Sequence, residues 1–347
     1  MYRHTYVEVN LDNIKNNIKK IISNYDYKYY FGVVKADCYG HGIKAVDAII
    51  KGGVNYLAVA TLEEAIEIRN IHKDIPILCL GLIYNDDIEV AVSNNITISI
   101  TSLDYLKSID INKLKTSVHI KINTGMNRLG VSSKEEFNEV YKLLNDNNIL
   151  IEGIYSHVYN ASSSNDTLNQ FNKFEEITSD IDLSNIRIVH IQASDALTNY
   201  ESPSYVNGCR LGIIMYGFND KLDLLSTFKV KSSVIQINKV NGVLGYNGIY
   251  HADNELIAVI PIGYADGVIR KNTGRGVYIN NKKYNIVGNI CMDMLFVKVD
   301  DSIKMYDVVE IIKDNHHIME ISKYLDTIPY EIMCEFGKRV PRVYIGE

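Results

Sequence analysis

Lys35 is the residue of this 347-residue chain whose position points most directly to chemistry. It follows the apolar run Tyr30–Val34, which has the composition of a buried strand. Because burying an ammonium group is costly, a lysine in such a place tends to lose its proton, and a neutral amine can form a Schiff base with an aldehyde cofactor. A single lysine at a strand end more often extends to solvent. The surrounding residues therefore decide between the two interpretations.

The segment from Val33 to Gly42 reads VVKADCYGHG. This string resembles the pyridoxal-phosphate signature of the alanine racemases, in which a lysine is followed by a tyrosine and by Gly-His-Gly. The resemblance implies that Lys35 carries pyridoxal 5'-phosphate covalently and that the hydroxyl of Tyr39 binds its phosphate. The glycines on either side of His41 would allow a tight turn after the strand.

A second string, KINTGMNRLG from Lys121 to Gly130, resembles another motif of that family. The resemblance implies that Arg128 bonds the phenolic oxygen of the cofactor and contacts the substrate. It also implies that Lys121 is the lysine that the family commonly carbamylates, so that the carbamate orients the arginine. Without the rest of the string, Lys121 and Arg128 would be interpreted as a surface pair beyond a strand.

The strings IYSH, HIQAS and RLGIIMYG extend the resemblance. They imply that His157 packs against the cofactor ring, that Ser194 binds the phosphate, and that the backbone N–H groups of Gly212 and Ile213 do the same. Arg210 is expected to face the pyridine nitrogen. Because a guanidinium only donates hydrogen bonds, the ring would be a weaker electron sink than in most pyridoxal enzymes, which disfavours decarboxylation.

The segment LGYNGIY resembles the family motif that carries the second catalytic base, which would be Tyr246. Racemisation removes a proton from one face of Cα and returns it to the other, and Lys35 can serve only one face. In the family this tyrosine comes from the partner subunit. The resemblance therefore implies a homodimer whose active sites are shared across the interface. Taken alone, Tyr246 would be a turn tyrosine.

Two strings in the last third concern the substrate. PIGYADG implies that Tyr264 lines the substrate entrance, and ICMD implies that the backbone of Met292 contacts the substrate carboxylate. Two positions differ from the family pattern: Lys338 stands before RVPR where a tyrosine is common, and Asn289 stands where an arginine is common. The substrate therefore stays open among alanine, serine and other amino acids.

The first two-thirds of the chain alternate between short apolar runs and amphipathic segments, a pattern typical of repeated βα units. Thr61 with Glu64, and Ser133 with Glu136, have the spacing of capping boxes. An eighth, short strand is predicted at Tyr205–Cys209. A (β/α)8 TIM-like barrel is favoured over an open doubly wound sheet. The other predicted strands are Tyr30–Val34, Tyr56–Ala60, Ile77–Leu80, Ile96–Ile100, Val118–Ile122, Gly153–Tyr155 and Ile188–Ile191.

After about Phe218 the pattern changes to strand-like runs separated by glycine-containing turns, interrupted by one predicted helix at Ile318–Leu325. The expected domains are a barrel over residues 10–222 and a mainly-β C-terminal domain over residues 223–347, which residues 1–9 are expected to join. The predicted strands are Val230–Ile237, Leu256–Ile260, Gly276–Ile279, Phe296–Val299 and Val308–Ile312.

Composition excludes several classes of protein. The net charge of −6 is spread over interspersed acidic and basic residues, so a nucleic-acid partner is not expected. The five cysteines form no CxxC pair, which disfavours a disulfide framework or a metal site and suits the cytoplasm. The chain contains no apolar run long enough to span a bilayer, although it could be one part of a longer membrane protein.

The leading hypothesis is a pyridoxal-phosphate-dependent racemase that converts L-alanine to D-alanine with Lys35 and Tyr246 as its two bases, for D-alanine supply to the cell wall. A serine or broad-specificity amino-acid racemase is the alternative within the same class. A pyridoxal-phosphate-binding regulatory protein is the non-enzyme alternative; such proteins share the barrel and its lysine but lack the β domain.

Overall fold

The computed structural model describes residues 2–347, which form two compact units. The first unit, Lys15–Cys38 with Val46–Leu224, contains a closed barrel. The second unit, residues 2–14 with Tyr39–Ala45 and Leu225–Glu347, is built on a mainly antiparallel sheet.

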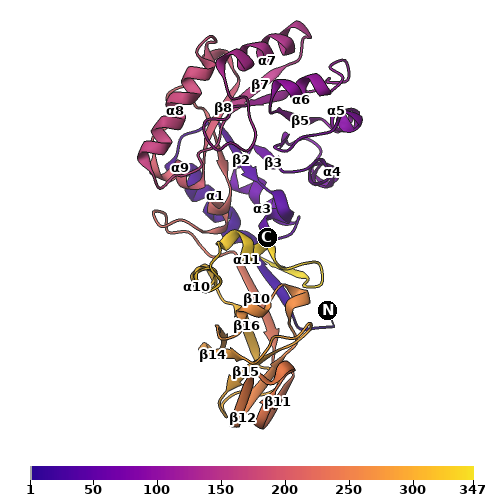
Figure 1. Ribbon diagram of the computed structural model, residues 1–347, viewed down its shortest axis with the longest axis vertical. Helices are drawn as coiled ribbons and strands as arrows, with labels where there is room; N and C mark the ends of the chain where they lie inside the picture. The colour runs from indigo at the N-terminus through magenta and orange to yellow at the C-terminus, as the bar shows by residue number, and fades with distance from the viewer. Residues whose placement is uncertain (1) are drawn as a thin grey trace. The chain divides into compact units, whose positions relative to one another are not determined.

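Within the described residues, eight parallel strands close the barrel of the first unit (Figure 1). β2 pairs with β9, which completes the ring and confirms the predicted barrel over the open doubly wound sheet. The strands are mostly apolar and almost entirely buried, as expected for parallel strands covered by helices. They are β2 (Tyr29–Val33), β3 (Tyr56–Val59), β4 (Ile77–Cys79), β5 (Ile96–Ile100), β6 (Val118–Lys121), β7 (Ile151–Tyr155), β8 (Ile188–Ala193) and β9 (Gly208–Leu211).

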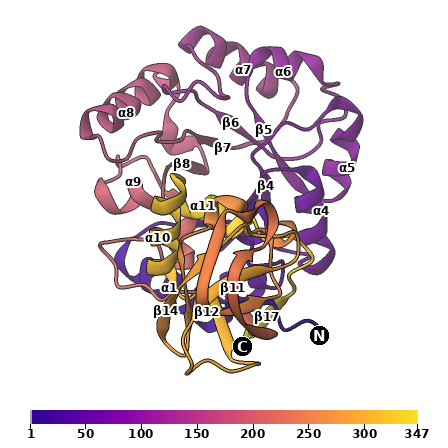
Figure 2. The same ribbon diagram turned by 60° about the horizontal axis from the view of Figure 1, so that its bottom comes forward.

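Helices surround these strands, and Figure 2 shows α4 to α8 on the outside of β4 to β8. Thr61 and Glu64 form the predicted capping box at the start of α4. Ser133 caps α7, but Glu136 accepts from the N–H of Ser132 instead of Ser133, so the second predicted box is only half formed. The helices are α1 (Leu11–Asn24), α3 (Ala45–Gly52), α4 (Leu62–Ile71), α5 (Ile88–Ser93), α6 (Leu103–Ser108), α7 (Lys134–Asp146), α8 (Ser164–Thr178) and α9 (Ser194–Asn199).

The last barrel strand begins at Gly208 and ends at Leu211, so the prediction of Tyr205–Cys209 is shifted along the chain. The N–H of Val206 donates to the carbonyl of Pro203, which closes a turn just before the strand. Asn207 then bonds to the neighbouring strand through both its backbone and its side chain. Because of this turn, β9 begins at Gly208 and not at Tyr205.

Aromatic rings fill the barrel interior. Phe31 stacks on Tyr56 and on His190, with ring centroids 4.4 Å apart in both pairs. His190 also stacks on Tyr155 at 4.7 Å. His119 meets this stack edge-on, 5.2 Å from His190. The interior is therefore a packed core that contains two buried histidines.

Gly153 makes room for one of them, because a Cβ at this position would lie 2.5 Å from ring atoms of His119. We expect Gly153→Ala to lower the free energy of unfolding by about 1–3 kcal/mol, since overpacking a rigid core forces rings off their preferred positions. Urea unfolding followed by circular dichroism would measure this. Gly337→Ala is the matched control, because nothing lies within 4 Å of a Cβ there. Equal stability of the two variants would contradict the close packing.

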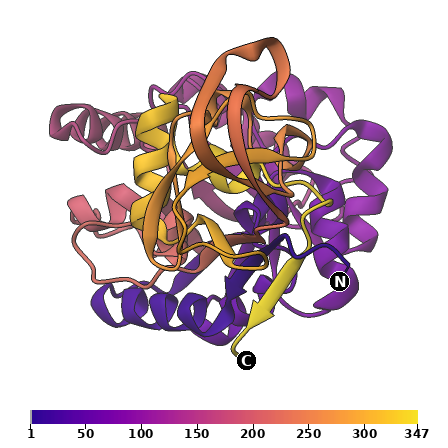
Figure 3. The ribbon, with the colours of Figure 1, turned by 90° about the horizontal axis from the view of Figure 1, so that it is seen from below.

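The sheet of the second unit has, within the described residues, the strand order β11-β12-β15-β14-β13-β16-β10-β1-β17. β1 pairs antiparallel with β10 and parallel with β17, so both ends of the chain belong to this sheet (Figure 3). The strands of this sheet are β1 (Tyr6–Asn10), β10 (Phe228–Ser233), β11 (Gln236–Leu244), β12 (Tyr250–Ile260), β13 (Gly276–Ile279), β14 (Lys282–Val287), β15 (Leu295–Val299), β16 (Val308–Ile312) and β17 (Arg342–Ile345). The unit also contains the helices α10 (Asn315–Leu325) and α11 (Pro329–Cys334).

The predicted single strand Val230–Ile237 is wrong, because the chain changes partners within it. Val234 donates its N–H to Asp307, whereas the next residue, Ile235, donates to Val259 on β12. β10 therefore ends at Ser233 and β11 begins at Gln236. The strand-like residue types of this segment continue across the switch, so the sequence alone does not reveal it.

Across residues 2–347, no helix is long and apolar enough to cross a membrane. In the same part of the chain the five cysteines form no disulfide.

Candidate active site

Lys35 opens the short segment α2 (Lys35–Tyr39), just after β2. Residues 36–38 adopt left-handed backbone angles, with φ between 52° and 55°. This conformation costs about 1–2 kcal/mol per non-glycine residue, so surrounding contacts must hold it. The N–H of Ala36 donates to Glu64 Oε1 at 2.7 Å, and the N–H of Cys38 donates to the carbonyl of Val34 at 3.0 Å. Glu64 thus supports the turn that carries Lys35.

Basic side chains gather near Lys35 in the barrel. Lys121 ends β6 and is buried. Burial, and after it the positive charges of Arg128, Arg210 and Lys35, together lower the pKa of Lys121 to about 8. Within residues 2–347 none of Lys121, Arg128 and Arg210 forms an ion pair with a carboxylate. This unbalanced positive charge favours an anionic ligand.

Arg210 lies on β9 and is buried. Its Nη1 donates to His190 Nδ1 at 2.8 Å, and its Nη2 donates to His157 Nδ1 at 3.0 Å and to the carbonyl of Ser156 at 2.7 Å. Burial lowers the pKa of His157 to about 3, with the charge of Arg210 as the next cause, so His157 is neutral and can accept. The Nε–H of Arg210 has no partner in the described chain and remains available as a donor.

Ser194, Gly212 and Ile213 lie together, as their predicted shared role requires. Ser194 opens α9, and its Oγ accepts from the N–H of Gly212 at 3.3 Å and of Ile214 at 3.5 Å. The N–H of Ile213 donates to no atom of residues 2–347. A hydroxyl beside several backbone N–H groups is the kind of arrangement that binds phosphate.

Tyr39 belongs to the second unit and is buried. Burial raises the pKa of its hydroxyl above the usual value, and Tyr330, whose ring lies 5.6 Å away, adds to this. Gly40 has φ +79°, and a Cβ there would lie 2.1 Å from the carbonyl oxygen of Met333. Gly42 has φ +89°. The tight turn predicted around the two glycines is confirmed.

Tyr246 begins a short 3-10 turn between β11 and β12, and 69% of it is exposed. Asn289 supports this turn: its Nδ2 donates to the carbonyl of Tyr246 at 2.8 Å, and its Oδ1 accepts from Arg270 at 2.6 Å. Asn289, where the family commonly has an arginine, therefore holds the backbone that carries the predicted base.

The structure also brings together the strings that contain Tyr264 and Met292. The N–H of Tyr264 donates to the carbonyl of Cys291 at 3.1 Å, and the N–H of Ala265 donates to the carbonyl of Met292 at 3.0 Å. Both side chains are exposed, whereas the N–H of Met292 bonds to nothing among the described residues. Lys338 is exposed.

Sequence reasoning missed several supporting residues. Glu64 was identified only as a helix cap, and nothing local indicates that its carboxylate also reaches Ala36. Asn289 was noted only as a departure from the family. His190 belongs to the string HIQAS, and its position within an apolar strand is the only signal in the sequence that it has a role.

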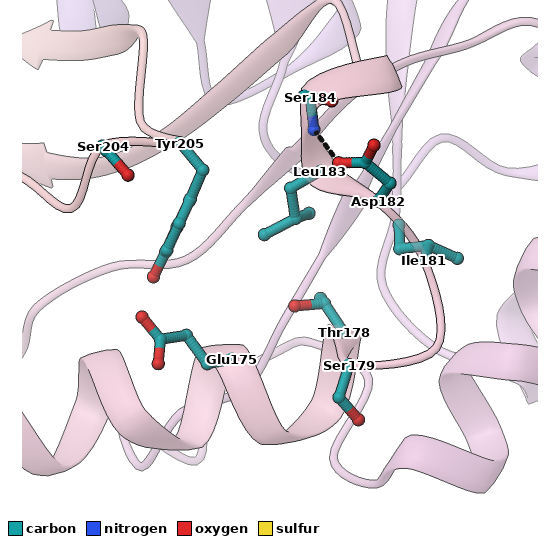
Figure 4. A pocket seen from close by; sticks show the side chains of 9 residues that line it. All are labelled: Glu175, Thr178, Ser179, Ile181, Asp182, Leu183, Ser184, Ser204 and Tyr205. Carbon is teal, nitrogen blue, oxygen red and sulfur yellow. Dashed lines mark hydrogen bonds between the residues drawn. The ribbon is translucent and has the colours of Figure 1, made fainter.

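A separate hollow of the barrel unit is lined by mostly polar side chains of α8 and the following segments (Figure 4). The N–H of Ser184 donates to Asp182 Oδ1 at 2.9 Å at its edge. It contains no predicted site residue. Its lining is Glu175, Thr178, Ser179, Ile181, Asp182, Leu183, Ser184, Ser204 and Tyr205.

Comparison with protein families gives a match for each part of the chain. The model of the alanine racemase N-terminal domain matches residues 9–220, and that of the alanine racemase C-terminal domain matches residues 227–344. This chain belongs to the alanine racemase family. The alanine racemase of Staphylococcus epidermidis is 33% identical over 99% of this chain and 95% of its own length. The alanine racemase of Clostridium novyi is 34% identical over 99% and 97%.

Solved structures of alanine racemases show the same fold. The enzyme of Clostridium difficile 630 superposes with a TM-score of 0.93 at 34% identity and covers 99% of this chain and 96% of its own. The enzyme of Bacillus anthracis with bound L-Ala-P superposes with a TM-score of 0.92 at 28% identity, over 100% and 96%. These alanine racemases confirm the family that the sequence motifs predicted.

Proposed function

We propose that this chain racemises alanine by moving the Cα proton between the two faces of the substrate. The observation that carries the proposal is the match to both alanine racemase domains along the whole chain. Relatives of 33–35% identity are named alanine racemases, so serine or a broad range of amino acids is not favoured as the substrate. The match at residues 227–344 also disfavours a regulatory protein that has only the barrel.

A panel of L-amino acids, analysed by chiral chromatography after incubation with the protein and pyridoxal 5'-phosphate, would test the substrate. D-Alanine is expected to form fastest. Faster racemisation of serine, or no racemisation of any amino acid, would contradict the proposal.

The barrel residues fit pyridoxal 5'-phosphate, a dianion with a ring nitrogen that accepts hydrogen bonds. The carboxylate-free cluster of Lys121, Arg128 and Arg210 offers positive charge, and Arg210 has an unused Nε–H for the ring nitrogen. We assign covalent attachment to Lys35 and contact with the ring to His157. When bound, the cofactor withdraws electrons from Cα, which makes the Cα proton removable.

Phosphate binding is assigned to Ser194, Gly212, Ile213 and Tyr39. The support is the convergence of the Ser194 hydroxyl with backbone N–H groups. Because Arg210 can only donate, a ring nitrogen that faces it would accept the hydrogen bond and stay unprotonated, which would weaken electron withdrawal by the ring.

Proton transfer is assigned to two groups of the chain. The amine of Lys35 serves one face of Cα, and the hydroxyl of Tyr246 serves the other. Arg128 and the free N–H of Met292 hold the substrate carboxylate, and Tyr264 lines the entrance. Fixing the carboxylate keeps Cα between the two bases, so the same site can work in both directions.

Lys121 is proposed to be carbamylated. With a pKa of about 8, the neutral amine that reacts with carbon dioxide becomes more abundant as pH rises through 8. The new C–N bond replaces an N–H, and a proton is released. We expect removal of carbon dioxide to lower racemase activity about tenfold, through loss of a charged hydrogen bond to Arg128, and bicarbonate to restore it.

The carbamate would be detected by ¹³C NMR after incubation with labelled bicarbonate. Lys121→Ala should lose both the signal and the bicarbonate effect, whereas Lys115→Ala, at an exposed lysine just before β6, should keep them. A bicarbonate effect that survives in Lys121→Ala would contradict the assignment.

We further propose a homodimer in which Tyr246 of one copy completes the site of the other. The support is the exposure of apolar side chains around the Tyr246 turn, since exposed apolar patches mark interfaces. Val243 and Ile249 are each 59% exposed, and Met292 and Met294 are 52% and 43% exposed.

A mixture of Lys35→Ala and Tyr246→Phe proteins tests this sharing. Each variant alone should be inactive, but after subunit exchange the hybrid dimer has one intact site, so up to about a quarter of the parent activity should return if exchange is random. Exchange would be verified by native mass spectrometry with one isotope-labelled partner. No recovery after verified exchange would place both bases in one chain.

We also propose domain limits of 10–222 and 223–347, with residues 1–9 joining the second domain, and a cytoplasmic location. The pairing of β1 with β10 supports the assignment of the N-terminal residues to the second domain. The absence of disulfides among residues 2–347 supports the cytoplasmic location.

A further inference from the structure

A line of buried polar side chains runs through the barrel from Arg210 to Glu152. Arg210 Nη1 lies 2.8 Å from His190 Nδ1, and His190 Nε2 lies 3.0 Å from His119 Nδ1. His119 Nε2 then faces Glu152 Oε2 at 3.5 Å. This last contact is longer than an ordinary hydrogen bond, and His119 Nε2 has no closer partner among residues 2–347. All four residues are buried.

The chemistry of the groups gives this line a direction. Arg210 can only donate, so His190 Nδ1 must accept and the proton of neutral His190 must be on Nε2. That proton is donated to His119 Nδ1, which places the proton of His119 on Nε2, facing Glu152. Burial, with the charges of Arg210 and His119 as further causes, lowers the pKa of His190 well below its usual value, which keeps it neutral. Every donor in the line therefore points toward the carboxylate.

The carboxylate of Glu152 is held as an acceptor. Burial alone would raise its pKa, but the contact with His119, the hydrogen bond from Tyr56 and the charge of Arg187 bring the pKa below its usual value. Tyr56 donates to Oε2 at 2.8 Å, and Arg187 donates to Oε1 at 2.9 Å. Three groups able to donate thus face one carboxylate, two of them at hydrogen-bond distance.

The backbone places Glu152 at an irregularity of the barrel. Val118 pairs with Ile151, whereas His119 pairs with Gly153, so Glu152 is an extra residue on β7. Such bulges re-aim a side chain. The His190 ring lies nearly parallel to Phe31 and Tyr155, at 13° and 10°, which prevents it from rotating freely.

We propose that Glu152, acting through His119 and His190, is a positioning residue for Arg210. The carboxylate fixes the proton on Nε2 of both imidazoles, so that Nδ1 of His190 always accepts from Arg210. If the proton moved to Nδ1 of His190, two donors would face each other and Arg210 would have to turn. The inference rests on the proposed function for its kinetic consequence, but not for the state of the histidines.

The first test needs no variant. In protein with ¹⁵N-labelled histidine, two-bond ¹H–¹⁵N correlations report which ring nitrogen carries the proton. His119 and His190, assigned by comparison with single histidine substitutions, are expected to be neutral with the proton on Nε2. A proton on Nδ1 of His190, or on both nitrogens, would overturn the proposal whether or not the protein is a racemase.

Glu152→Gln tests the role of the carboxylate, because an amide offers one oxygen to the three donors. We expect His190 to show a mixture of the two neutral forms. In the holoenzyme, kcat for alanine racemisation should fall about tenfold while KM changes less than about twofold, since Arg210 acts on the cofactor and not on substrate binding. Glu152→Asp should retain the parent histidine signals.

Tyr56→Phe is the matched control, because it removes a donor from the same carboxylate oxygen and leaves the line from Arg210 intact. It should cost stability but keep the histidine signals and kcat. If Glu152→Gln does not fold, His119→Phe interrupts the line while Glu152 keeps Tyr56 and Arg187, and the same change at His190 is expected. Unchanged His190 signals in a folded Glu152→Gln or His119→Phe protein would overturn the proposal.

Discussion

Lys35→Ala protein is expected to lose alanine racemisation by about 10⁴-fold or more, because the change removes both the covalent anchor of the cofactor and one of the two bases. Lys35 follows a buried strand and opens a left-handed turn held by Glu64, so its amine is presented from a rigid backbone. Alanine fits the same backbone positions as any other non-glycine residue, so the barrel should remain folded. Polarimetry or chiral chromatography would measure the rate.

Borohydride reduction of the parent holoenzyme, followed by peptide mapping, gives a second readout. The pyridoxyl group should be found on Lys35 and should be missing from the variant. Lys28→Ala, at an exposed lysine before the same strand, is the control and should behave like the parent. A pyridoxyl group on Lys121 or another lysine would contradict the assignment of Lys35.

Tyr246→Phe is expected to lower racemisation by about 10²–10⁴-fold, the usual contribution of a positioned acid or base. The change keeps the ring and removes only the hydroxyl. Because Tyr246 is 69% exposed and is held through its backbone carbonyl by Asn289, the fold should not change. The variant should still bind cofactor, as judged by its visible absorbance.

Hydrogen exchange in deuterated water separates the two bases. In Tyr246→Phe one enantiomer of alanine should still exchange its α-proton, because Lys35 serves that face, while exchange from the other enantiomer should be lost. Tyr306→Phe, at another exposed tyrosine of the second unit, is the control and should match the parent. Equal exchange of both enantiomers together with near-parent racemisation would make Tyr246 a bystander and require a one-base mechanism.

Local features of the chain were predictable from the sequence because they depend on neighbouring residues. Apolar runs located the first seven barrel strands, and the spacing of Thr61 and Glu64 predicted a capping box that is fully formed. The string around Lys35 and the strings around Arg210 and Tyr246 indicated the family, which the matches to both domains confirm. A motif keeps its residue types at fixed spacing, so it can be recognised before its surroundings are known.

Strand limits in the second unit were less predictable, because partner choice is not a local property. The N–H groups of Val234 and Ile235 bond to different neighbours, although the two residues are adjacent in one strand-like segment. The pairing of β1 with β17 joins the two ends of the chain in one sheet. Periodicity shows that a segment can pair, but not with which strand.

The chain by itself thus determined the family, the barrel and the residue types able to hold a cofactor and move a proton. Only the tertiary structure decided which side chains act on those residues. His119 and His190 are 71 positions apart, and Asn289 lies 43 positions from the carbonyl that it holds. Glu152 faces His119 because it is an extra residue in β7, and no sequence pattern predicts this irregularity. Such contacts depend on strand register and on the direction in which each side chain leaves the barrel wall, and both are settled only when the ring of strands closes.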